Sequence, residues 1–340
     1  MAPRHEFGFE LRVCAWAERA WPPSEDGTTP VVVARQLGTG SRRWDTLVVE
    51  VDPEGMAARA GFGERRLDSD LLHVVRNAPA EWTYYREALP HPGYPWRYVR
   101  EAIHRAADRG VLEERKAGNR IEIRRVHPYP DWVDRIVAIE NKPDLDASAA
   151  RALRDQMERD VAYALADEVW VATERTGDRV EPALLEDLPV EVGILAVGDG
   201  EAEVLWYPRG LAVDEPGTDI VERGEVTEYG DAAARFEYVD TDVKAHQRFV
   251  IAERAYERGW RSYVDTMRPD CRHFALRRAD HDFVPVCRAK GREQTAAECS
   301  ARCGSFEPEP PAWRQRRWPI DGGPGKTIKR VLADRRARRR

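Results

Sequence analysis

The stretch Arg135-Ile136-Val137-Ala138-Ile139-Glu140-Asn141-Lys142-Pro143 indicates the fold more strongly than any other part of the 340-residue sequence. A short aliphatic run of this kind is typical of a strand buried on both faces of a sheet. Successive strand residues point to opposite faces, so Glu140 and Lys142 should project to one side while Asn141 offers its main-chain carbonyl. The sequence therefore predicts a carboxylate and an ammonium group side by side where a buried strand ends.

The segments on either side predict an α/β core with a central mixed sheet flanked by helices. Residues 6–19 have apolar side chains at intervals of three and four residues, which predicts a helix with the Glu10 carboxylate on its inward face. Further strands are predicted at 31–34, 44–51, 168–173, 190–197 and 204–207, and further helices at 147–166 and 240–260. Asp45 stands at the start of one of these strands, which we expect to neighbour the strand that ends in Glu140.

Residues 68–127 have a different pattern and are predicted to form an inserted module. Helices are expected to open at Pro79 and at Pro95, followed by a hairpin with its turn at Gly118-Asn119. This order resembles a winged helix-turn-helix. The basic side chains expected to lie along DNA phosphates are Arg115, Lys116, Arg120, Arg124 and Arg125. The alternative is a solvated hairpin face or a protein-docking surface.

Four of the five cysteines are clustered near the C-terminus. They are Cys271, Cys287, Cys299 and Cys303, with His273 beside the first. In a reduced cytosol this clustering favours Zn²⁺ or a [4Fe–4S] cluster over disulfides, although no Cys-x-x-Cys pair is present. The alternative is a set of buried thiols without metal. Cys14 is predicted to be a core residue of the first helix.

Composition limits the class of protein. The net charge of −6 excludes a globally basic nucleic-acid coat, and the excess of arginine and carboxylates resembles proteins of salt-loving microbes. No run of about 18 apolar residues occurs, and no signal-peptide pattern is visible, so we expect a cytoplasmic protein outside the membrane. Oligomeric state has no sequence signal.

The chain divides into five predicted parts. Residues 1–67 and 128–262 should form the two halves of the core, and 68–127 the inserted winged-helix-like module. Residues 263–306 should form the four-cysteine metal-binding segment. Residues 307–340 are rich in proline and then strongly basic, which predicts a poorly ordered tail.

Hydrolysis of a phosphodiester requires a cation, an activated water and groups that hold both. We therefore predict Asp45 and Glu140 as ligands of Mg²⁺ or Mn²⁺, Lys142 as the group that orients the water, and Glu10 as a partner of a metal-bound water. Asp134, at the start of the same strand as Glu140, competes with Asp45 for the role of second carboxylate. The alternative interpretation is an exposed ion pair between Glu140 and Lys142 with little energetic importance.

This arrangement, over residues 6–210, resembles the restriction-endonuclease-like core of the PD-(D/E)xK nuclease superfamily, which includes RecB-type nucleases and archaeal Holliday-junction resolvases. Asp45, Glu140 and Lys142 match the motif residues, and Glu10 matches a first-helix glutamate of many members. Two features depart from the family pattern. Asp45 follows Trp44 instead of proline, and a long segment separates Asp45 from Glu140 where members have a short hairpin.

The resemblance extends to the following helix, in which Gln156, Asp160 and Tyr163 share one face, as in the polar helix on the active site of RecB-type members. Gln156 is accordingly expected to support catalysis. Some RecB-type nucleases hold an iron–sulfur cluster on C-terminal cysteines. The whole chain, including Phe9-Glu10-Leu11 and the stretch 140–145, is also similar to a haloarchaeal family of unknown activity.

The resemblance implies a Mg²⁺-dependent nuclease acting on DNA, with a role in DNA repair or recombination. The alternative is a non-catalytic DNA-binding or regulatory protein that keeps the fold, with the winged helix and a zinc site. A third interpretation is a scaffold whose polar strand end is incidental.

Overall fold

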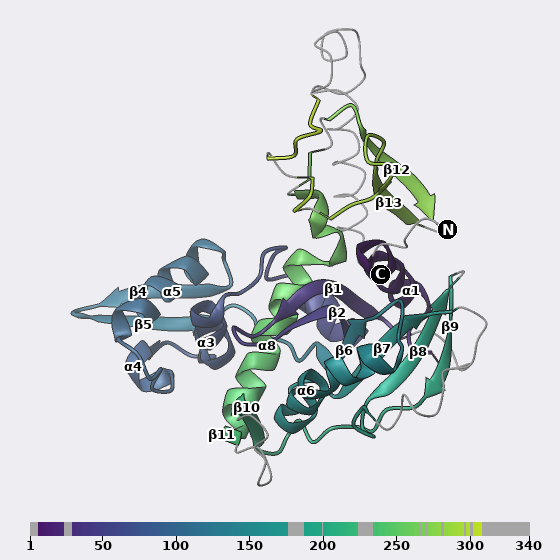
Figure 1. The fold of residues 1–340 in the computed structure, drawn as a ribbon. Coiled ribbons are helices and arrows are strands. Elements are labelled where there is room, and N and C mark those ends of the chain that lie inside the picture. The colour runs from purple at the N-terminus through teal and green to yellow at the C-terminus, as the bar shows by residue number, and fades with distance from the viewer. Residues whose placement is uncertain are drawn as a thin grey trace, which may run out of the picture.

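A six-stranded mixed sheet forms the centre of the computed structural model (Figure 1). The structure describes residues 6–23, 29–175, 187–198, 200–223, 234–265, 267–268, 271–279, 282–295, 297–299 and 302–307. The strands, in sheet order, are β1 (Val31–Gly38), β2 (Arg43–Val51), β6 (Val133–Asn141), β7 (Glu168–Glu174), β8 (Gly193–Gly198) and β9 (Glu201–Trp206). The pairs β6–β7 and β7–β8 are parallel and the other three are antiparallel, which confirms the predicted mixed α/β sheet.

Helices cover both faces of this sheet. Helix α1 (Glu6–Ala20) packs on one face, and α6 (Ala147–Tyr163) and α8 (Thr241–Arg258) pack on the other. Alternate residues of β6 enter the two cores, so that Val137 and Ile139 contact the α1 side and their neighbours the α6 and α8 side. Burial on both faces explains why these strands read as continuous aliphatic runs instead of alternating patterns.

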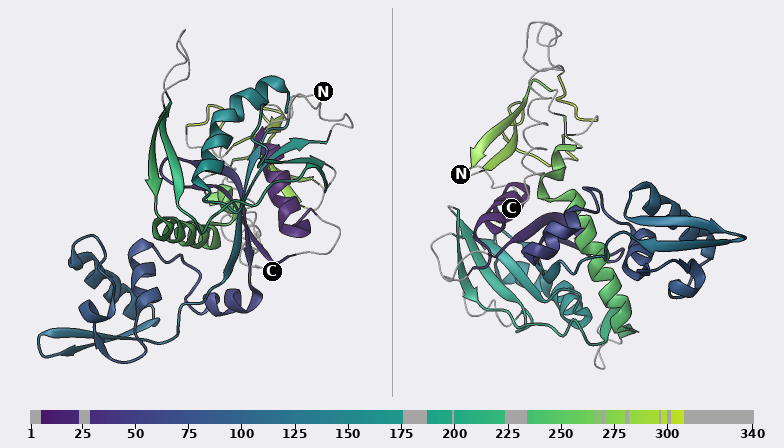
Figure 2. Two further views of the ribbon diagram at one scale, coloured as in Figure 1. Left: turned by 90° about the horizontal axis from the view of Figure 1, so that it is seen from below. Right: turned by 180° about the vertical axis from the view of Figure 1, so that it is seen from behind.

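Several boundaries differ from the sequence expectation. Strand β8 begins at Gly193, after the predicted start at 190, and β9 begins at Glu201, before the predicted start at 204. The connection between the two strands is therefore shorter than predicted. A two-stranded ribbon, β10 (Gly217–Arg223) with β11 (Ala234–Val239), was not predicted from the sequence. Figure 2 shows this ribbon beside α6 and α8. Phe236 and Tyr238 alternate with Arg235 and Glu237 on β11, but both aromatic side chains are exposed and do not belong to the core.

The inserted residues form a separate helical unit with its own small sheet. Helix α2 (Pro53–Ala60) precedes it and packs on the main core through Met56. The elements of the unit are α3 (Ser69–Asn77), β3 (Thr83–Tyr84), α4 (Tyr85–Ala88), α5 (Trp96–Asp108), β4 (Leu112–Ala117) and β5 (Arg120–Arg125), with the strands ordered β3-β5-β4. The hairpin and the helix after Pro95 lie where expected. The helix expected at Pro79 was wrong: α3 ends before this residue, and the Pro79 carbonyl instead accepts the N–H of Arg125.

This unit is joined to the core at Glu253 of α8, which also forms a buried ion pair with Arg59 of α2. The guanidinium of Arg59 donates to both carboxylate oxygens of Glu253, and neither side chain is exposed. Glu253 also accepts the N–H of Leu67 at 2.7 Å and the hydroxyl of Tyr129 at 2.9 Å. Four donors therefore satisfy one carboxylate.

The C-terminal segment packs against α1 on the side away from the sheet. It contains η1 (Trp260–Asp265) and a small sheet of β12 (Phe274–Ala279), β13 (Asp282–Cys287) and β14 (Arg292–Glu293). Phe7 of α1 meets Tyr263 edge to face at 6.0 Å between ring centroids. The predicted tail lies outside the described residues from 308 onward. No helix in the described part of the chain is both long and apolar enough to cross a membrane.

Candidate active site

Asp45 and Glu140 lie opposite each other on the neighbouring strands β2 and β6. The ladder pairs Thr46 with Ile139, so Asp45, one residue before Thr46, lies opposite Glu140, one residue after Ile139, near the end of β6. There the Oδ2 atom of Asp45 accepts the N–H of Asn141 at 3.0 Å. The two predicted metal ligands are thus brought together by strand register.

Gln36 joins Asp45 to the carboxylate of the first helix. Its amide Nε2 donates to Asp45 Oδ1 at 2.9 Å and to Glu10 Oε1 at 3.1 Å. Gln36 has φ of +53°, a left-handed conformation that is costly for a residue with a side chain. Glu10 is buried as predicted, and Arg35 donates to both of its oxygens, at 2.8 and 3.0 Å.

Arg42, in the turn between β1 and β2, lies between two buried carboxylates. It donates from Nη2 to Glu140 Oε2 at 3.2 Å and to Asp160 Oδ2 at 2.8 Å. Its Nε reaches both oxygens of Asp160, at 2.9 and 3.0 Å. The bond to Asp160 is the stronger of the two, so Arg42 can stay anchored on α6 if Glu140 takes another partner.

Lys142 pairs with Glu6 of α1, whose Oε1 lies 3.2 Å from its Nζ. Burial lowers the pKa of Lys142, but the carboxylates of Glu6, Glu140 and Asp45 outweigh this effect and raise it, so the amine stays charged. Glu140 is 8% exposed and is bonded to Arg42, not to Lys142. The expectation of a simple exposed ion pair between Glu140 and Lys142 is therefore wrong.

The charges of this region do not balance. These interactions join the carboxylates of Glu6, Glu10, Asp45, Glu140 and Asp160 to the cations of Arg35, Arg42 and Lys142. This hydrogen-bonded network therefore holds five carboxylates and three cations. Burial, together with repulsion from Asp45, raises the pKa of Glu140 to about 7. The site therefore favours either a proton or a cation beside Glu140.

The remaining residues singled out in the sequence are Asp134, Gln156 and Tyr163. Asp134 stands at the opposite end of β6, where burial and Asp52 raise its pKa, so it is Asp45 that approaches Glu140. The amide nitrogen of Gln156 is buried without a hydrogen-bond partner. The hydroxyl of Tyr163 turns to Gln247 of α8 at 2.6 Å, away from the carboxylates.

Gln36 and Arg42 were missed in the sequence. Arg42 lies between the two strands predicted at 31–34 and 44–51, and its partner Asp160 is distant in the chain. Gln36 follows the predicted first strand, and its left-handed conformation has no pattern in the residue types. Only tertiary contacts reveal either side chain as part of the site.

Three of the five basic residues predicted to lie along DNA form ion pairs with glutamates of the inserted unit. Arg115 pairs with Glu122 at 2.6 Å, Arg120 with Glu87 at 3.3 Å, and Arg124 with Glu113. Arg115 and Arg124 also cover the ring of Trp82. The hairpin face is thus less positive than its sequence suggests, because acidic neighbours offset these arginines.

The four clustered cysteines line one pocket. His273 is not among the lining residues and bonds Glu307 through Nε2 at 2.9 Å. Across the described residues, no three His, Cys, Asp or Glu side chains form a group already arranged to hold a metal ion. Asp45 and Glu140, near the end of β6, form a pair of carboxylates that a cation could bind.

A family model matches residues 32–308, which include Asp45, Glu140, Lys142 and all four clustered cysteines. The match begins after α1, the helix that holds Glu10. Neither a curated protein nor a solved structure matches the chain. The chain belongs to the family of unknown function DUF5787.

Proposed function

We propose that this protein is a Mg²⁺-dependent deoxyribonuclease of the PD-(D/E)xK type. The observation that carries the proposal is the pairing of Asp45 and Glu140 across β2 and β6, where burial and repulsion from Asp45 raise the pKa of Glu140. Mg²⁺ is usually held by one or two carboxylates, with water and substrate phosphate completing its shell. A pair of carboxylates therefore suits this ion, as it would the similar Mn²⁺.

Each side chain has a defined part in the proposed reaction. Asp45 and Glu140 would hold the metal, which, when bound, would offset charge on the scissile phosphate and lower the pKa of a water ligand. Lys142 stays charged and would orient the attacking water and stabilise the phosphate. Glu10 and Gln36 would fix the orientation of Asp45 through their shared hydrogen bonds.

The order of core elements supports this assignment. The sequence α1-β1-β2-β6-α6-β7, with β6 between β2 and β7, is similar to the restriction-endonuclease-like core. The residues between β2 and β6 fold as a unit of their own, which accounts for the long separation of Asp45 and Glu140. Gln156 lies on α6 one turn before Asp160, the partner of Arg42, and would support the site from that helix.

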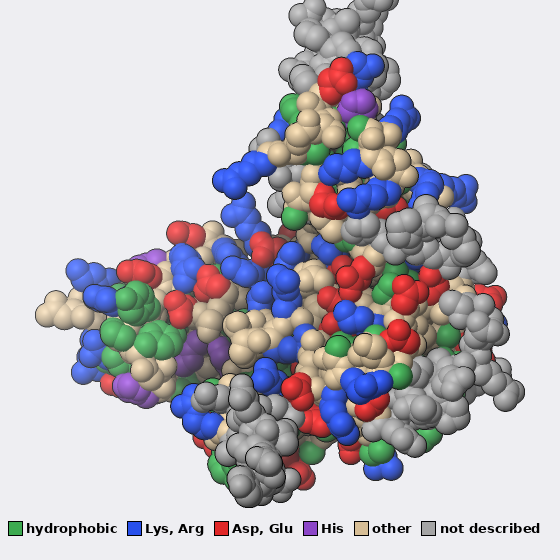
Figure 3. Space-filling model, viewed as in Figure 1, with side chains coloured by type: hydrophobic (Ala, Val, Ile, Leu, Met, Phe, Trp, Pro, Cys, Tyr) green, Lys and Arg blue, Asp and Glu red, His purple; other side chains and the backbone are tan. Residues whose placement is uncertain are grey.

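DNA is proposed as the substrate because positive charge gathers beside the site. Figure 3 shows Lys and Arg side chains between the inserted unit and the core, over the region of α8. On α8, burial and the nearby Arg66 lower the pKa of Arg254, whose Nη1 donates to the Gly38 carbonyl at 2.5 Å. Like charges held together beside the β1–β2 hairpin favour a polyanion.

The alternative proposal is a non-catalytic DNA-binding protein that uses the inserted unit as a winged helix. The order α3-β3-α4-α5-β4-β5 supports it. In that arrangement α5 would enter the groove with Arg97 and Arg100 on its exposed face. The offset charge on the hairpin makes this contact weaker than the sequence suggested.

Cleavage assays test the catalytic proposal. Single-stranded, duplex and branched DNA would be incubated with the full chain at several salt concentrations, with Mg²⁺ or Mn²⁺ and with chelator. We expect metal-dependent cleavage that falls by at least about a hundredfold in Asp45→Asn and Lys142→Ala, because each change removes a charge at the reacting phosphate. Asp134→Asn is the matched control, since it makes the same change at the other end of β6, and it should cleave normally.

Two results would contradict the proposal. The first is the absence of cleavage by the wild type on every substrate, with DNA binding retained, which would support the non-catalytic alternative. The second is equal cleavage by wild type and Lys142→Ala, which would point to a contaminating nuclease.

A further inference from the structure

The four cysteines converge from separate parts of the C-terminal segment. Cys271 precedes β12, Cys287 ends β13, and Cys299 and Cys303 follow β14 in turns. All four line one pocket, and none is in a disulfide. Three of them are buried and Cys303 is half-buried. The fold thus brings together four thiols that lie at separate places along the C-terminal segment.

The backbone around the pocket donates hydrogen bonds to sulfur. The N–H of Arg268 points to Cys299 Sγ and the N–H of Glu307 to Cys271 Sγ, each at 3.5 Å. Donors of this kind stabilise negative charge on sulfur, which is the form that binds metals. Arg268 also covers the ring of Phe306, which closes one side of the pocket.

The segment has too little apolar core to hold itself together. From 271 to 307, the buried apolar side chains among the described residues are those of Phe274, Val284, Pro285 and three of the cysteines. Phe274 and Val284 belong to the core cluster that α1 shares, so the helix supports the segment from one side only. A metal bound by the free thiols would cross-link the turns around the pocket.

We propose that the Sγ atoms of Cys271, Cys287, Cys299 and Cys303 bind one structural Zn²⁺. The pocket has space for a body about as large as one water molecule, which suits a single ion and not a four-iron cluster. The sulfur atoms are not yet arranged as a metal site, so binding must draw them inward. Four S–H groups release protons to solvent, four Zn–S bonds form, and nothing is oxidised.

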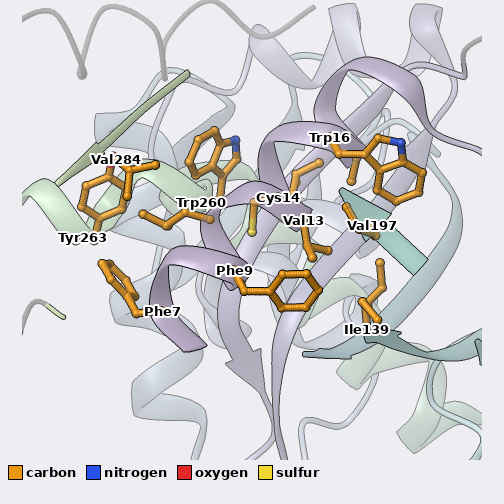
Figure 4. Packing of buried hydrophobic residues seen from close by; sticks show 14 of the residues in the cluster. Phe7, Phe9, Val13, Cys14, Trp16, Ile139, Val197, Trp260, Tyr263 and Val284 are labelled. Atoms are coloured by element: carbon orange, nitrogen blue, oxygen red, sulfur yellow. The ribbon is translucent and has the colours of Figure 1, made fainter. Parts of the chain in front are cut away.

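This site would anchor the first helix. In α1, Gly8 lies so close to Glu293 that an added Cβ would sit 1.4 Å from Glu293 Oε2. Glu293 lies on β14, which pairs with β13, the strand that ends at Cys287. The Glu293 carboxylate also forms an ion pair with Arg277 on β12. Figure 4 shows α1 side chains Phe7 and Phe9 between Tyr263 and Val284 on one side and Ile139 on the other. Zn²⁺ would therefore help to hold the helix that presents Glu6 and Glu10.

The zinc proposal does not depend on nuclease activity and is tested without it. Metal analysis of the purified full chain should find about one Zn²⁺ per chain and no brown colour. Cys271→Ser and Cys299→Ser should reduce zinc to a small fraction of that value. Cys14→Ser is the matched control, because Cys14 is equally buried but lies in α1, and it should retain zinc.

Thermal unfolding provides a second readout. Chelator should lower the midpoint of the wild type, and Zn²⁺ should restore it where Mg²⁺ alone does not. If the serine variants fail to fold, wild-type protein loaded with Co²⁺ should show the visible absorption of thiolate ligation. Absence of zinc, iron with sulfide in its place, or unchanged zinc in folded Cys299→Ser would each overturn the proposal.

Discussion

Two buried clusters of acid and arginine in this molecule differ in how well their charges are matched. In the Arg59–Glu253 pair, one carboxylate meets one guanidinium and two further donors, and nothing is left over. Near the end of β6, Glu140 shares Arg42 with Asp160 and lies opposite Asp45, so carboxylates outnumber cations in this network. The comparison separates a pair that holds two units together from a site that is incomplete without a proton or a cation.

The largest effect is expected from breaking the matched pair. Arg59→Ala leaves Glu253 buried with an uncompensated charge, which should lower the free energy of unfolding by about 3–5 kcal/mol. Denaturant unfolding of the variant and the wild type measures this loss. Arg66→Ala, which removes a half-exposed pair with Glu257, is the control and should change stability by less than about 1 kcal/mol. An equal loss in both variants would show that the buried pair has no special role.

A change of opposite sign is expected at the unmatched site. Between pH 4.5 and about 7 the folded chain keeps a proton on Glu140 that the unfolded chain has lost, so stability should fall as pH rises through this window. In chelator at pH 8, Glu140→Gln should therefore be more stable than the wild type, by on the order of 1–3 kcal/mol. Unfolding curves from pH 5 to 8 measure the difference. A loss of stability in Glu140→Gln at pH 8 would contradict the excess of negative charge.

The smallest effect concerns the residue that links Asp45 to Glu10. Gln36→Leu removes both amide hydrogen bonds, which should weaken Mg²⁺ or Mn²⁺ binding by about 1 kcal/mol, or roughly fivefold. Calorimetric titration measures the affinity. Gln247→Leu also removes one hydrogen bond, to Tyr163, but should leave metal affinity unchanged. Equal affinities in Gln36→Leu and the wild type would show that the strained residue does not position the ligands.

Periodicity alone predicted much of the core. The aliphatic run before Glu140, the inward Glu10 and the helix over α6 all follow from spacing, because burial selects residue types at fixed intervals. The pairing of Asp45 with Glu140 was predicted from their places on two strands expected to be neighbours, and strand register is what brings them together. The ribbon β10–β11 was missed although Phe236 and Tyr238 alternate with charged residues, and its aromatic side chains are exposed instead of buried in the core.

The sequence by itself determined which residue types end the buried strands and that four cysteines lie near the C-terminus. Tertiary structure alone decided that Arg42 reaches Glu140 and Asp160, that Gln36 bridges Asp45 and Glu10, and that the thiols share one pocket. The physical reason is that local patterns report burial along one element, whereas charge balance depends on side chains that distant elements bring within a few ångströms.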